Sequence, residues 1–386
     1  MNRKVIIFTS TRAEYGLLRR VALEIEKEET LELKLLVSGT HLVLEQGSTI
    51  EEIRSDGIKE ISSIDIKLDD DSAKGICTSM GLAIQKYGEF LQDETPDILL
   101  LLGDRYETFC CAAAAQICGI PIAHIHGGER TEGLVDEAFR HSITKMSHVH
   151  FPCSEEYKNR IIQMGESPEN VYNVGSLGVE NIRSMKLLGK HELEESIGFK
   201  LDKPFFLITF HPVTLEKNSA GKQFAELLAA LAKYPDYKCI FTGANADTDG
   251  NVINQMIKEY VKVYTYRCFA ISSLGYLRYL SAMHLCEAVL GNSSSGILEA
   301  PALKVPTINI GDRQKGRIRT ESIIDCGPLE NSILKSLKKA FSKQFQQNMQ
   351  EMKIPHEKKG TAYNIKDVIK TVDFKILLKK SFFDNI

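Results

Sequence analysis

The chain has 386 residues, a net charge of −3 and a sequence isoelectric point near 6.4. This length exceeds one typical hydrophobic core and favours two domains. The slightly acidic balance excludes the broad basic surface with which proteins bind nucleic acid. No stretch reaches the roughly 18 uninterrupted apolar residues of a membrane span, so we expect a cytoplasmic protein with no membrane partner.

The first half of the chain alternates short apolar runs with stretches of helical period. Such runs are typical of strands that are buried on both faces of a parallel sheet. The predicted strands are Val5–Thr9, Leu33–Val37, Ile98–Leu102, Ile120–Ile125 and Val149–Pro152. Ligands of open α/β sheets bind beyond the carboxyl ends of the strands, so the residues that follow each run are the candidates for function.

The turn after the first predicted strand reads STRAEYG and lacks the G-x-G-x-x-G dinucleotide fingerprint. Arg12 in this turn is a candidate phosphate ligand, or else a surface arginine of the loop. The strand that ends at Leu102 is followed by Asp104 and Arg105. This pair indicates an acid or base and a cation near sugar or phosphate; the alternative is a salt bridge with a helix cap.

The next strand ends in HIHGGE, which contains His124, His126 and Glu129 and leads on to Asp136. Alternate residues of a strand share a face, so we expect the two histidines to point the same way. An H-x-H pattern also suits a metal, but no third ligand has the spacing of a zinc site. A histidine and an aspartate at a strand end favour proton transfer.

The βαβ pattern restarts after a predicted hinge around Val174–Ser184. The predicted strands are Phe205–Phe210, Cys239–Thr242, Val261–Tyr264, Ala288–Leu290 and Thr307–Ile310. His211 follows the first of them, and we expect it to face the same cleft as the motifs of the first half.

The run GNSSSGILEAPALKVPTINIGDRQKGR, from Gly291 to Arg317, predicts a nucleotide diphosphate site. Small residues at a strand-to-helix turn allow backbone amides and hydroxyls to contact an anion, and Ser293, Ser294 and Gly296 form such a turn. Glu299 follows in the presumed helix, where its carboxylate suits the hydroxyls of a ribose. The alternative is a serine-rich helix cap without a ligand.

Seven motifs in order resemble the hydrolysing UDP-N-acetylglucosamine 2-epimerases of sialic-acid-type nonulosonate synthesis: STRAEYG, GDRYE, HIHGGE, RHSITKMSH, FHPVT, GNSSSG and GDRQKGR. The resemblance implies an α/β, GT-B-like fold of two Rossmann-type doubly wound parallel-sheet domains with a cleft between them. It places these domains at 1–177 and 178–362, with a C-terminal helix at about 363–386 that packs back on the first. It also implies no cofactor, no metal, a UDP-sugar substrate and a homodimer or homotetramer.

The resemblance also assigns roles. It places the uridine diphosphate on Arg12, Ser293, Ser294, Glu299 and Arg313, and the sugar against Asp104, Arg105, His126, Asp136 and His211. Elimination of UDP to a 2-acetamidoglycal, followed by hydration, then needs Asp104 or Asp136 as base and the two histidines as proton donors or orienting groups. Many relatives carry Glu at position 126, so His126 or the nearby Glu129 must take over that role here, and Glu129 is also expected to contact the substrate. Relatives also often carry Lys at position 17, where this chain has Leu17.

Two other functions fit parts of the pattern. A GT-B glycosyltransferase also holds UDP through a glutamate that precedes a small residue and a proline, as in Glu299-Ala300-Pro301. A catalytically silent nucleotide-sugar sensor would keep the serine turn and lose the acids of the first half. The sequence does not distinguish UDP-N-acetylglucosamine from its 2,4-diacetamido-2,4,6-trideoxy relative, because both sugars offer the same C1 and C2.

Overall fold

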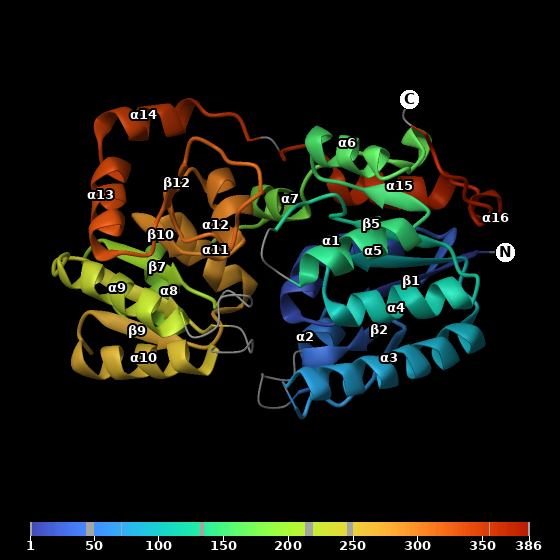
Figure 1. Cartoon of the computed structure of the whole chain (residues 1–386), viewed down its shortest axis with the longest axis horizontal. Coiled ribbons are helices and arrows are strands. Elements are labelled where there is room, and N and C mark those ends of the chain that lie inside the picture. The colour runs from blue at the N-terminus through green and yellow to red at the C-terminus, as the bar shows by residue number, and fades with distance from the viewer. Residues whose placement is uncertain are drawn as a thin grey trace. The chain divides into compact units, whose positions relative to one another are not determined.

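A computed structural model of the chain describes residues 2–43, 50–70, 72–131, 135–212, 219–244, 250–354 and 356–384. The chain forms two compact units (Figure 1). Unit 1 contains Met1–Glu129, Val135–Asn181 and His356–Ile386, and unit 2 contains Arg130–Leu134 and Ile182–Pro355. The boundary between Asn181 and Ile182 therefore falls inside the predicted hinge. The end of the chain, from His356, belongs to unit 1.

Unit 1 is built on a parallel sheet of six strands in the order β3-β2-β1-β4-β5-β6. The strands are β1 (Arg3–Thr9), β2 (Leu31–Ser38), β3 (Ile61–Ile64), β4 (Ile98–Leu102), β5 (Ile122–Ile125) and β6 (Val149–Phe151). Its helices are α1 (Arg12–Glu26), η1 (Gly39–Leu42), α2 (Ile50–Ser55), α3 (Ala73–Glu94), α4 (Tyr106–Ile117), α5 (Asp136–Met146), α6 (Glu155–Gln163), η3 (Pro168–Asn170), α15 (Thr361–Thr371) and α16 (Phe374–Leu377). Helix α7 (Leu177–Ser184) spans the division between the units.

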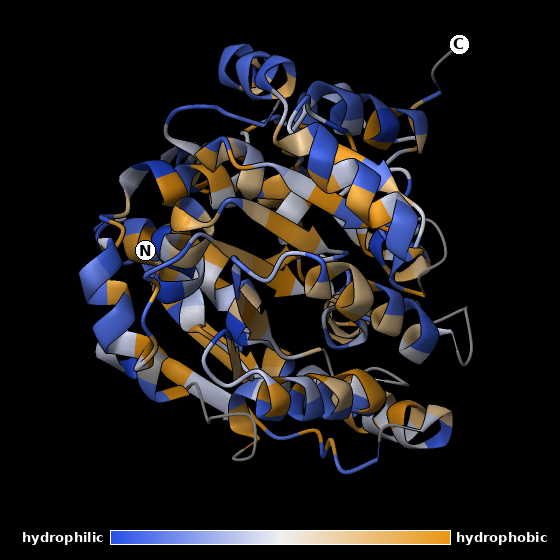
Figure 2. Ribbon diagram, turned by 90° about the vertical axis from the view of Figure 1, so that its left-hand side faces the viewer, coloured by the Kyte–Doolittle hydropathy of each residue, from blue (hydrophilic) through white to orange (hydrophobic). Residues whose placement is uncertain are grey.

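Both faces of this sheet are covered, because alternate residues of the central strands point to opposite sides. Val5 and Ile7 of β1 pack in one hydrophobic cluster with α1 and α15, whereas Ile6 and Phe8 pack in a second cluster with α3 and α4. Figure 2 shows the same pattern for the chain in general, with hydrophobic strands enclosed by helices whose outer faces are hydrophilic. Strands buried on both sides explain why the predicted runs are continuously apolar.

Unit 2 repeats the arrangement with a six-stranded parallel sheet in the order β12-β11-β10-β7-β8-β9. The strands are β7 (Phe205–Thr209), β8 (Lys238–Thr242), β9 (Cys268–Ile271), β10 (Ala288–Gly291), β11 (Thr307–Ile310) and β12 (Ile323–Cys326). Its helices are α8 (Lys190–Ile197), α9 (Ala220–Ala232), α10 (Gly250–Val263), α11 (Gly275–Leu285), α12 (Ser295–Leu298), η4 (Ala300–Leu303), α13 (Glu330–Ala340) and α14 (Lys343–Glu351). The predicted α/β class with two doubly wound sheets is confirmed.

One predicted strand is wrong. Val261–Tyr264 does not form a strand, because residues to Val263 complete helix α10, whose Ile253 and Ile257 are buried one turn apart. The strand lies further on, at Cys268–Ile271. A short apolar run at the end of an amphipathic helix resembles a buried strand, and the helical period decides between them.

The end of the chain differs in detail from the single helix expected at about 363–386. The structure has two helices, α15 and the short α16, and the described residues after them, up to 384, form no further helix or strand. Within the described ranges, none of the helices combines the length and apolar character that a membrane span requires.

Candidate active site

The two sheets share one topology, and each has a switch point where the strand order reverses direction. In unit 1 this point lies between β1 and β4, and in unit 2 between β7 and β10. Ligands of doubly wound sheets bind beyond the carboxyl ends of the strands at such points. Arg12 and Asp104 follow the two switch-point strands of unit 1, and His211 and Ser293 follow those of unit 2.

The turn after β1 already holds a carboxylate. Glu14 accepts hydrogen bonds from the Ser10 amide at 2.7 Å, the Ser10 hydroxyl at 2.8 Å and the Thr11 amide at 3.1 Å. Burial raises the pKa of Glu14 to about 7, against the lowering effect of the Arg105 charge. Arg12 is the first residue of α1 and is half-buried. Glu14 thus occupies the amides of Ser10 and Thr11, and these two amides are not available to an anion.

Asp104 and Arg105 do not pair with each other. Asp104 forms an ion pair with Arg140 of α5, whose side chain is only 2% exposed. Arg140 also donates to Glu137 at 2.9 Å and to the Glu129 carbonyl at 3.2 Å. Arg105 instead forms a two-point contact with the buried Glu107, at 3.0 and 3.1 Å. The alternative of a local Asp104–Arg105 salt bridge is therefore wrong.

Asp136 opens helix α5 and is half-buried. It lies four residues before Arg140, so the two side chains occupy one face of the helix a turn apart. Arg140 pairs with Asp104 and with Glu137, the residue after Asp136, so the first turns of helix α5 contact the strand end that carries Asp104.

The histidines of the HIHGGE motif have different partners. His124 lies within β5, is fully buried, and contacts the Gly103 carbonyl at 2.7 Å and the Thr144 hydroxyl at 3.2 Å. Burial lowers the pKa of His124 to about 3, so its ring is neutral at pH 7. His126 lies just past the strand in the left-handed region, with φ +64°. The alternation expected for an H-x-H strand therefore ends at Ile125.

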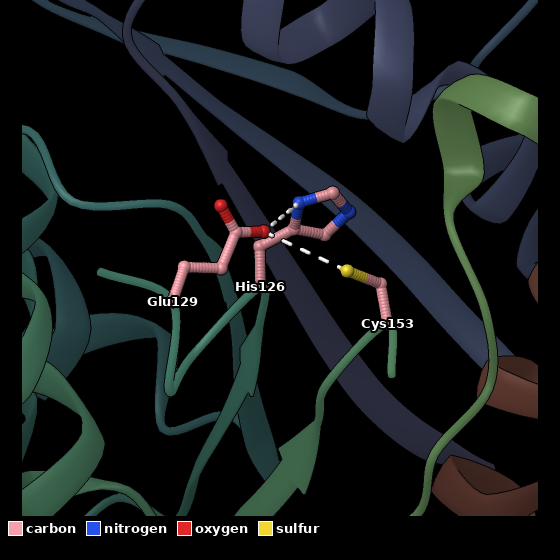
Figure 3. A group of neighbouring side chains, drawn as sticks. All are labelled: His126, Glu129 and Cys153. Atoms are coloured by element: carbon pink, nitrogen blue, oxygen red, sulfur yellow. Dashed lines mark hydrogen bonds and ion pairs between the residues drawn. The ribbon is translucent and has the colours of Figure 1, made fainter. Parts of the chain in front are cut away.

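His126 is held by Glu129 in a tight turn. Nδ1 of His126 lies 3.0 Å from Oε1 of Glu129, and the Glu129 side chain is only 3% exposed (Figure 3). Gly128 has φ +76°, and a Cβ at this position would overlap the Tyr157 carbonyl, so this close turn requires glycine. Glu129 was predicted to contact substrate, but its burial behind His126 favours an indirect role.

In unit 2, His211 is positioned by Asn292, which follows the neighbouring strand β10. The Asn292 side chain accepts from the His211 amide at 2.7 Å and donates to the His211 carbonyl at 2.8 Å. Burial, and after it the positive charge of Arg313, holds the pKa of His211 well below its usual range. His211 is therefore a neutral imidazole at pH 7.

The serine turn begins a shorter helix than the sequence suggests. Helix α12 has only four residues, Ser295–Leu298, with Ser294 at its N-cap position. Glu299 is the residue that ends it, not one in its second turn, and it accepts a hydrogen bond from the Ser295 hydroxyl. Pro301 explains the early end, because proline lacks an amide proton and disfavours helix at the residues before it.

The remaining predicted residues of unit 2 surround this turn. Gly296 packs directly on β11, where its carbonyl accepts from the Thr307 hydroxyl at 2.8 Å and a Cβ would lie 2.8 Å from the Thr307 methyl group. Arg313 donates to the Asn292 carbonyl at 3.2 Å, so its guanidinium lies beside the turn that contains Ser293.

Three of these residues were not predicted as part of a site. Arg140 and Asn292 are almost fully buried and organise Asp104 and His211, and Cys153 lies against Glu129. A sequence signal existed for Arg140, since Asp136, Glu137 and Arg140 are spaced for one helical face. Cys153 and Asn292 had no such signal, because their partners lie on neighbouring strands.

Comparison with known proteins identifies the family. The family model described as UDP-N-acetylglucosamine 2-epimerase matches residues 23–370. The chain belongs to this family. A Campylobacter jejuni relative named GDP/UDP-N,N'-diacetylbacillosamine 2-epimerase (hydrolyzing) is 41% identical over 99% of both chains. The Escherichia coli polysialic acid biosynthesis protein P7 is 41% identical over 96% of this chain and 95% of its own length.

A crystal structure of UDP-GlcNAc 2-epimerase from Neisseria meningitidis, bound to UDP-GlcNAc, superposes with a TM-score of 0.80 at 20% identity. It covers 95% of this chain and 99% of its own, and it supports the GT-B-like fold of two Rossmann-type domains. The predicted family, fold and enzyme class of this chain, a hydrolysing 2-epimerase, are thus confirmed. A glycosyltransferase is not favoured.

Proposed function

We propose that this epimerase converts a UDP-linked 2-acetamido sugar of gluco configuration, with water, into UDP and the free manno sugar. The substrate is UDP-N-acetylglucosamine, which gives N-acetylmannosamine, or its 2,4-diacetamido-2,4,6-trideoxy relative. The observation that carries this proposal is the 41% identity over 99% of the chain to a relative whose name states a hydrolysing 2-epimerase. Such a reaction is the first step of sialic-acid-type nonulosonate synthesis.

The reaction requires two bonds to break in its first stage. The C1–O bond leaves with its electron pair on UDP, the C2 proton passes to a base, and the C2–H electron pair becomes the C1=C2 bond of a 2-acetamidoglycal. The C2 proton is only weakly acidic, so departure of UDP must build positive charge at C1. Cations and hydrogen-bond donors that stabilise the diphosphate therefore lower this barrier.

Unit 2 supplies most of the proposed diphosphate and ribose contacts. We assign the diphosphate to Ser293, Ser294 and the Gly296 turn, which follow β10, and to Arg313, which follows β11 and donates to the carbonyl of Asn292 in that turn. Glu299 is assigned to the ribose hydroxyls, for which its carboxylate is a strong acceptor. From unit 1, Arg12 is assigned to the diphosphate and Arg105 to the sugar end of the substrate.

The proton transfers are assigned to Asp104, Asp136, His126 and His211. Asp104 is held in an ion pair by Arg140. Asp104 or Asp136 takes the C2 proton in the elimination. In the second stage, water adds to C1 and a proton returns to the other face of C2, which gives the manno configuration. His126 and His211 serve as proton donors or orienting groups in these steps.

Deuterium labelling tests this proposal directly. In D₂O, without added nicotinamide, we expect UDP and a manno sugar that carries one deuterium at C2, because the glycal takes its C2 hydrogen from solvent. Each of the two nucleotide sugars is incubated separately, and the product is analysed by mass and proton NMR spectra. A product without deuterium at C2, or one that keeps the gluco configuration, would exclude the elimination mechanism even if UDP is released. The nucleotide sugar that is turned over identifies the substrate.

A further inference from the structure

A chain of four buried polar side chains lies behind the proposed proton donor His126. Nδ1 of His126 lies 3.0 Å from Oε1 of Glu129, Sγ of Cys153 lies 3.7 Å from the same oxygen, and Nδ1 of His356 lies 3.5 Å from Sγ. Figure 3 shows the first three side chains facing one another. All four residues are at most 7% exposed. Neither the family resemblance nor the assigned roles use Cys153 or His356.

Three separate segments of unit 1 build this chain of contacts. His126 and Glu129 follow β5, and Cys153 follows the neighbouring strand β6. His356 arrives from the returning C-terminal segment, where its carbonyl accepts from the Ser176 amide at 2.8 Å and its ring stacks on Tyr157 with centroids 5.9 Å apart. The arrangement is therefore held by the backbone on every side.

The chemistry of the groups sets the direction of the hydrogen bonds. An ionised carboxylate only accepts, so both partners of Glu129 must donate to it. Nδ1 of His126 then carries a proton, and the thiol proton of Cys153 points at Glu129. The sulfur is left to accept from Nδ1–H of His356. The direction of the whole chain thus follows from the charge on Glu129.

The other ring nitrogen of His126 is left for the substrate. Nε2 of His126 is buried and has no hydrogen-bond partner among the residues that the structure describes. A buried nitrogen without a partner is costly, as is the left-handed backbone of His126, at φ +64°. Both costs are typical of a side chain held ready for a ligand.

We propose that Glu129 and Cys153 are positioning residues that hold His126 with a proton on Nδ1, so that Nε2 takes up a proton from solvent and delivers it to C2 of the sugar. This proposal rests on the proposed function. In the hydration stage, the Nε2–H bond of the imidazolium breaks, the C1=C2 electron pair takes the proton to form C2–H, and water oxygen bonds to C1. The water proton goes to a carboxylate of the site, and solvent later restores the proton on His126. Glu129 stabilises the imidazolium throughout.

The same atoms are of the kinds that bind zinc, and His126, Glu129 and Cys153 place one ligand atom each within 4.8 Å of one another. Their mutual hydrogen bonds already account for the arrangement without an ion. Binding of a metal by these three residues is one of the outcomes that the experiment below distinguishes.

The test compares Glu129→Gln, Cys153→Ala and Cys153→Ser in the full chain. A Gln amide can donate to Nδ1, which moves the ring proton to Nε2, so kcat should fall by about 10²- to 10⁴-fold. Cys153→Ala should lower kcat by about tenfold, the scale of one hydrogen bond, and Cys153→Ser should recover most of it because serine keeps a donor. The affinity for UDP, measured by calorimetry, should not change.

The matched control is Cys286→Ala, which removes a buried thiol that donates to the Met283 carbonyl at 3.2 Å in unit 2. Its kcat should stay normal. Two further readouts separate positioning from simple support of the fold. In ¹⁵N-histidine NMR, His126 should carry its proton on Nδ1 in the wild type and on Nε2 in Glu129→Gln. The alkaline limb of the kcat profile should move to lower pH in Glu129→Gln, because the carboxylate that stabilises the imidazolium is gone.

His126→Ala separates this proposal from the proposed function. If His126→Ala loses turnover while Glu129→Gln keeps kcat within about twofold and the same pH profile, the positioning role is wrong and the proposed role of His126 stands. If His126→Ala turns over normally, the role of His126 itself is wrong, and the positioning role falls with it. If turnover is lost on chelation and restored by zinc, these side chains form a metal site and not a hydrogen-bonded chain.

Discussion

Glu14 and Glu299 show how the surroundings of a carboxylate decide what it can bind. Glu14 closes back on three donors of its own turn, and burial raises its pKa to about 7, so it is committed to the fold. Glu299 accepts from Ser295, a residue of the turn proposed to hold diphosphate. A ribose hydroxyl can replace the serine as donor without loss of a hydrogen bond, and Ser295 is then available to the phosphate.

We therefore predict that Glu299→Ala weakens UDP binding by about 1.5–3 kcal/mol, the range for hydrogen bonds to a charged group. Isothermal titration of UDP into the folded variant measures this loss. Glu259→Ala, at an exposed position of α10, serves as the control and should bind UDP normally. Unchanged UDP affinity in Glu299→Ala would remove the ribose assignment.

At this scale the sequence predicts which residues stand at strand ends but not which side chain each one contacts. Asp104 and Arg105 are adjacent, and the sequence could only suggest that they pair. Their actual partners are Arg140 and Glu107, and these contacts depend on how the helices pack. The contact of Cys153 with His356 joins residues 203 positions apart, and no local pattern indicates such a pair.

At the scale of elements, apolar runs predict strands that are fully buried and miss the partly buried strand at one edge of each sheet. Strands β3 and β12 lie at the outer edges of their sheets and read ISSI and IIDC. They are only partly buried, so they carry too few apolar residues to stand out from loops. Central strands such as β4 are buried on both faces and were predicted with their observed bounds, Ile98–Leu102.

The turn after β10 depends on one glycine at the switch point of unit 2. Gly291 has φ +131°, and a Cβ there would overlap the carbonyl of Thr209 on β7. We expect Gly291→Ala to lower the free energy of unfolding of unit 2 by at least about 3 kcal/mol, since both the backbone conformation and the approach of the two strands are lost.

Gly81→Ala is the matched control, and we expect it to change stability in the opposite direction. Gly81 lies within α3, and a Cβ at this position meets nothing within 4 Å. Alanine there should raise the free energy of unfolding by about 0.5–1 kcal/mol, because it favours the helix. Urea unfolding of both variants beside the wild type measures these effects. A Gly291→Ala protein as stable as the wild type would show that the turn tolerates a side chain.

At the scale of the whole molecule, repetition made the fold predictable. The βαβ pattern occurs twice, and both sheets have the same strand order, counted from the first strand of each unit. Each motif could therefore be assigned to a strand end before its partners were known. Several titratable groups are buried in this fold, and burial shifts their pKa values on folding. The stability of the fold therefore depends on pH.

Three histidines of unit 1 predict that acid weakens its fold. Burial lowers the pKa of His41 to about 4, of His124 to about 3 and of His148 to about 4. Below about pH 6.5 the unfolded chain takes up protons that the folded unit does not, so stability falls as the pH falls. From pH 7.5 to 5.5 the three groups together cost about 4 kcal/mol.

Glu14 opposes this effect and supplies the test. Its pKa is raised to about 7, so the folded unit holds a proton that the unfolded chain has lost between about pH 4.5 and 7, and stability rises as the pH falls through that window. Glu14 therefore contributes about 2 kcal/mol of stability as the pH falls from about 7.5 to 5.5. The free energy of unfolding of the wild type then falls by a net amount of about 2 kcal/mol. Glu14→Gln removes the compensation, so its loss between pH 7.5 and 5.5 should be about 4 kcal/mol.

Urea unfolding of both proteins at the two pH values, with unit 1 followed by amide hydrogen exchange, measures the difference. Equal pH dependence in the two proteins would show that Glu14 is ionised in the folded unit, and a stability that rises toward pH 5.5 in Glu14→Gln would show that the buried histidines are protonated in place.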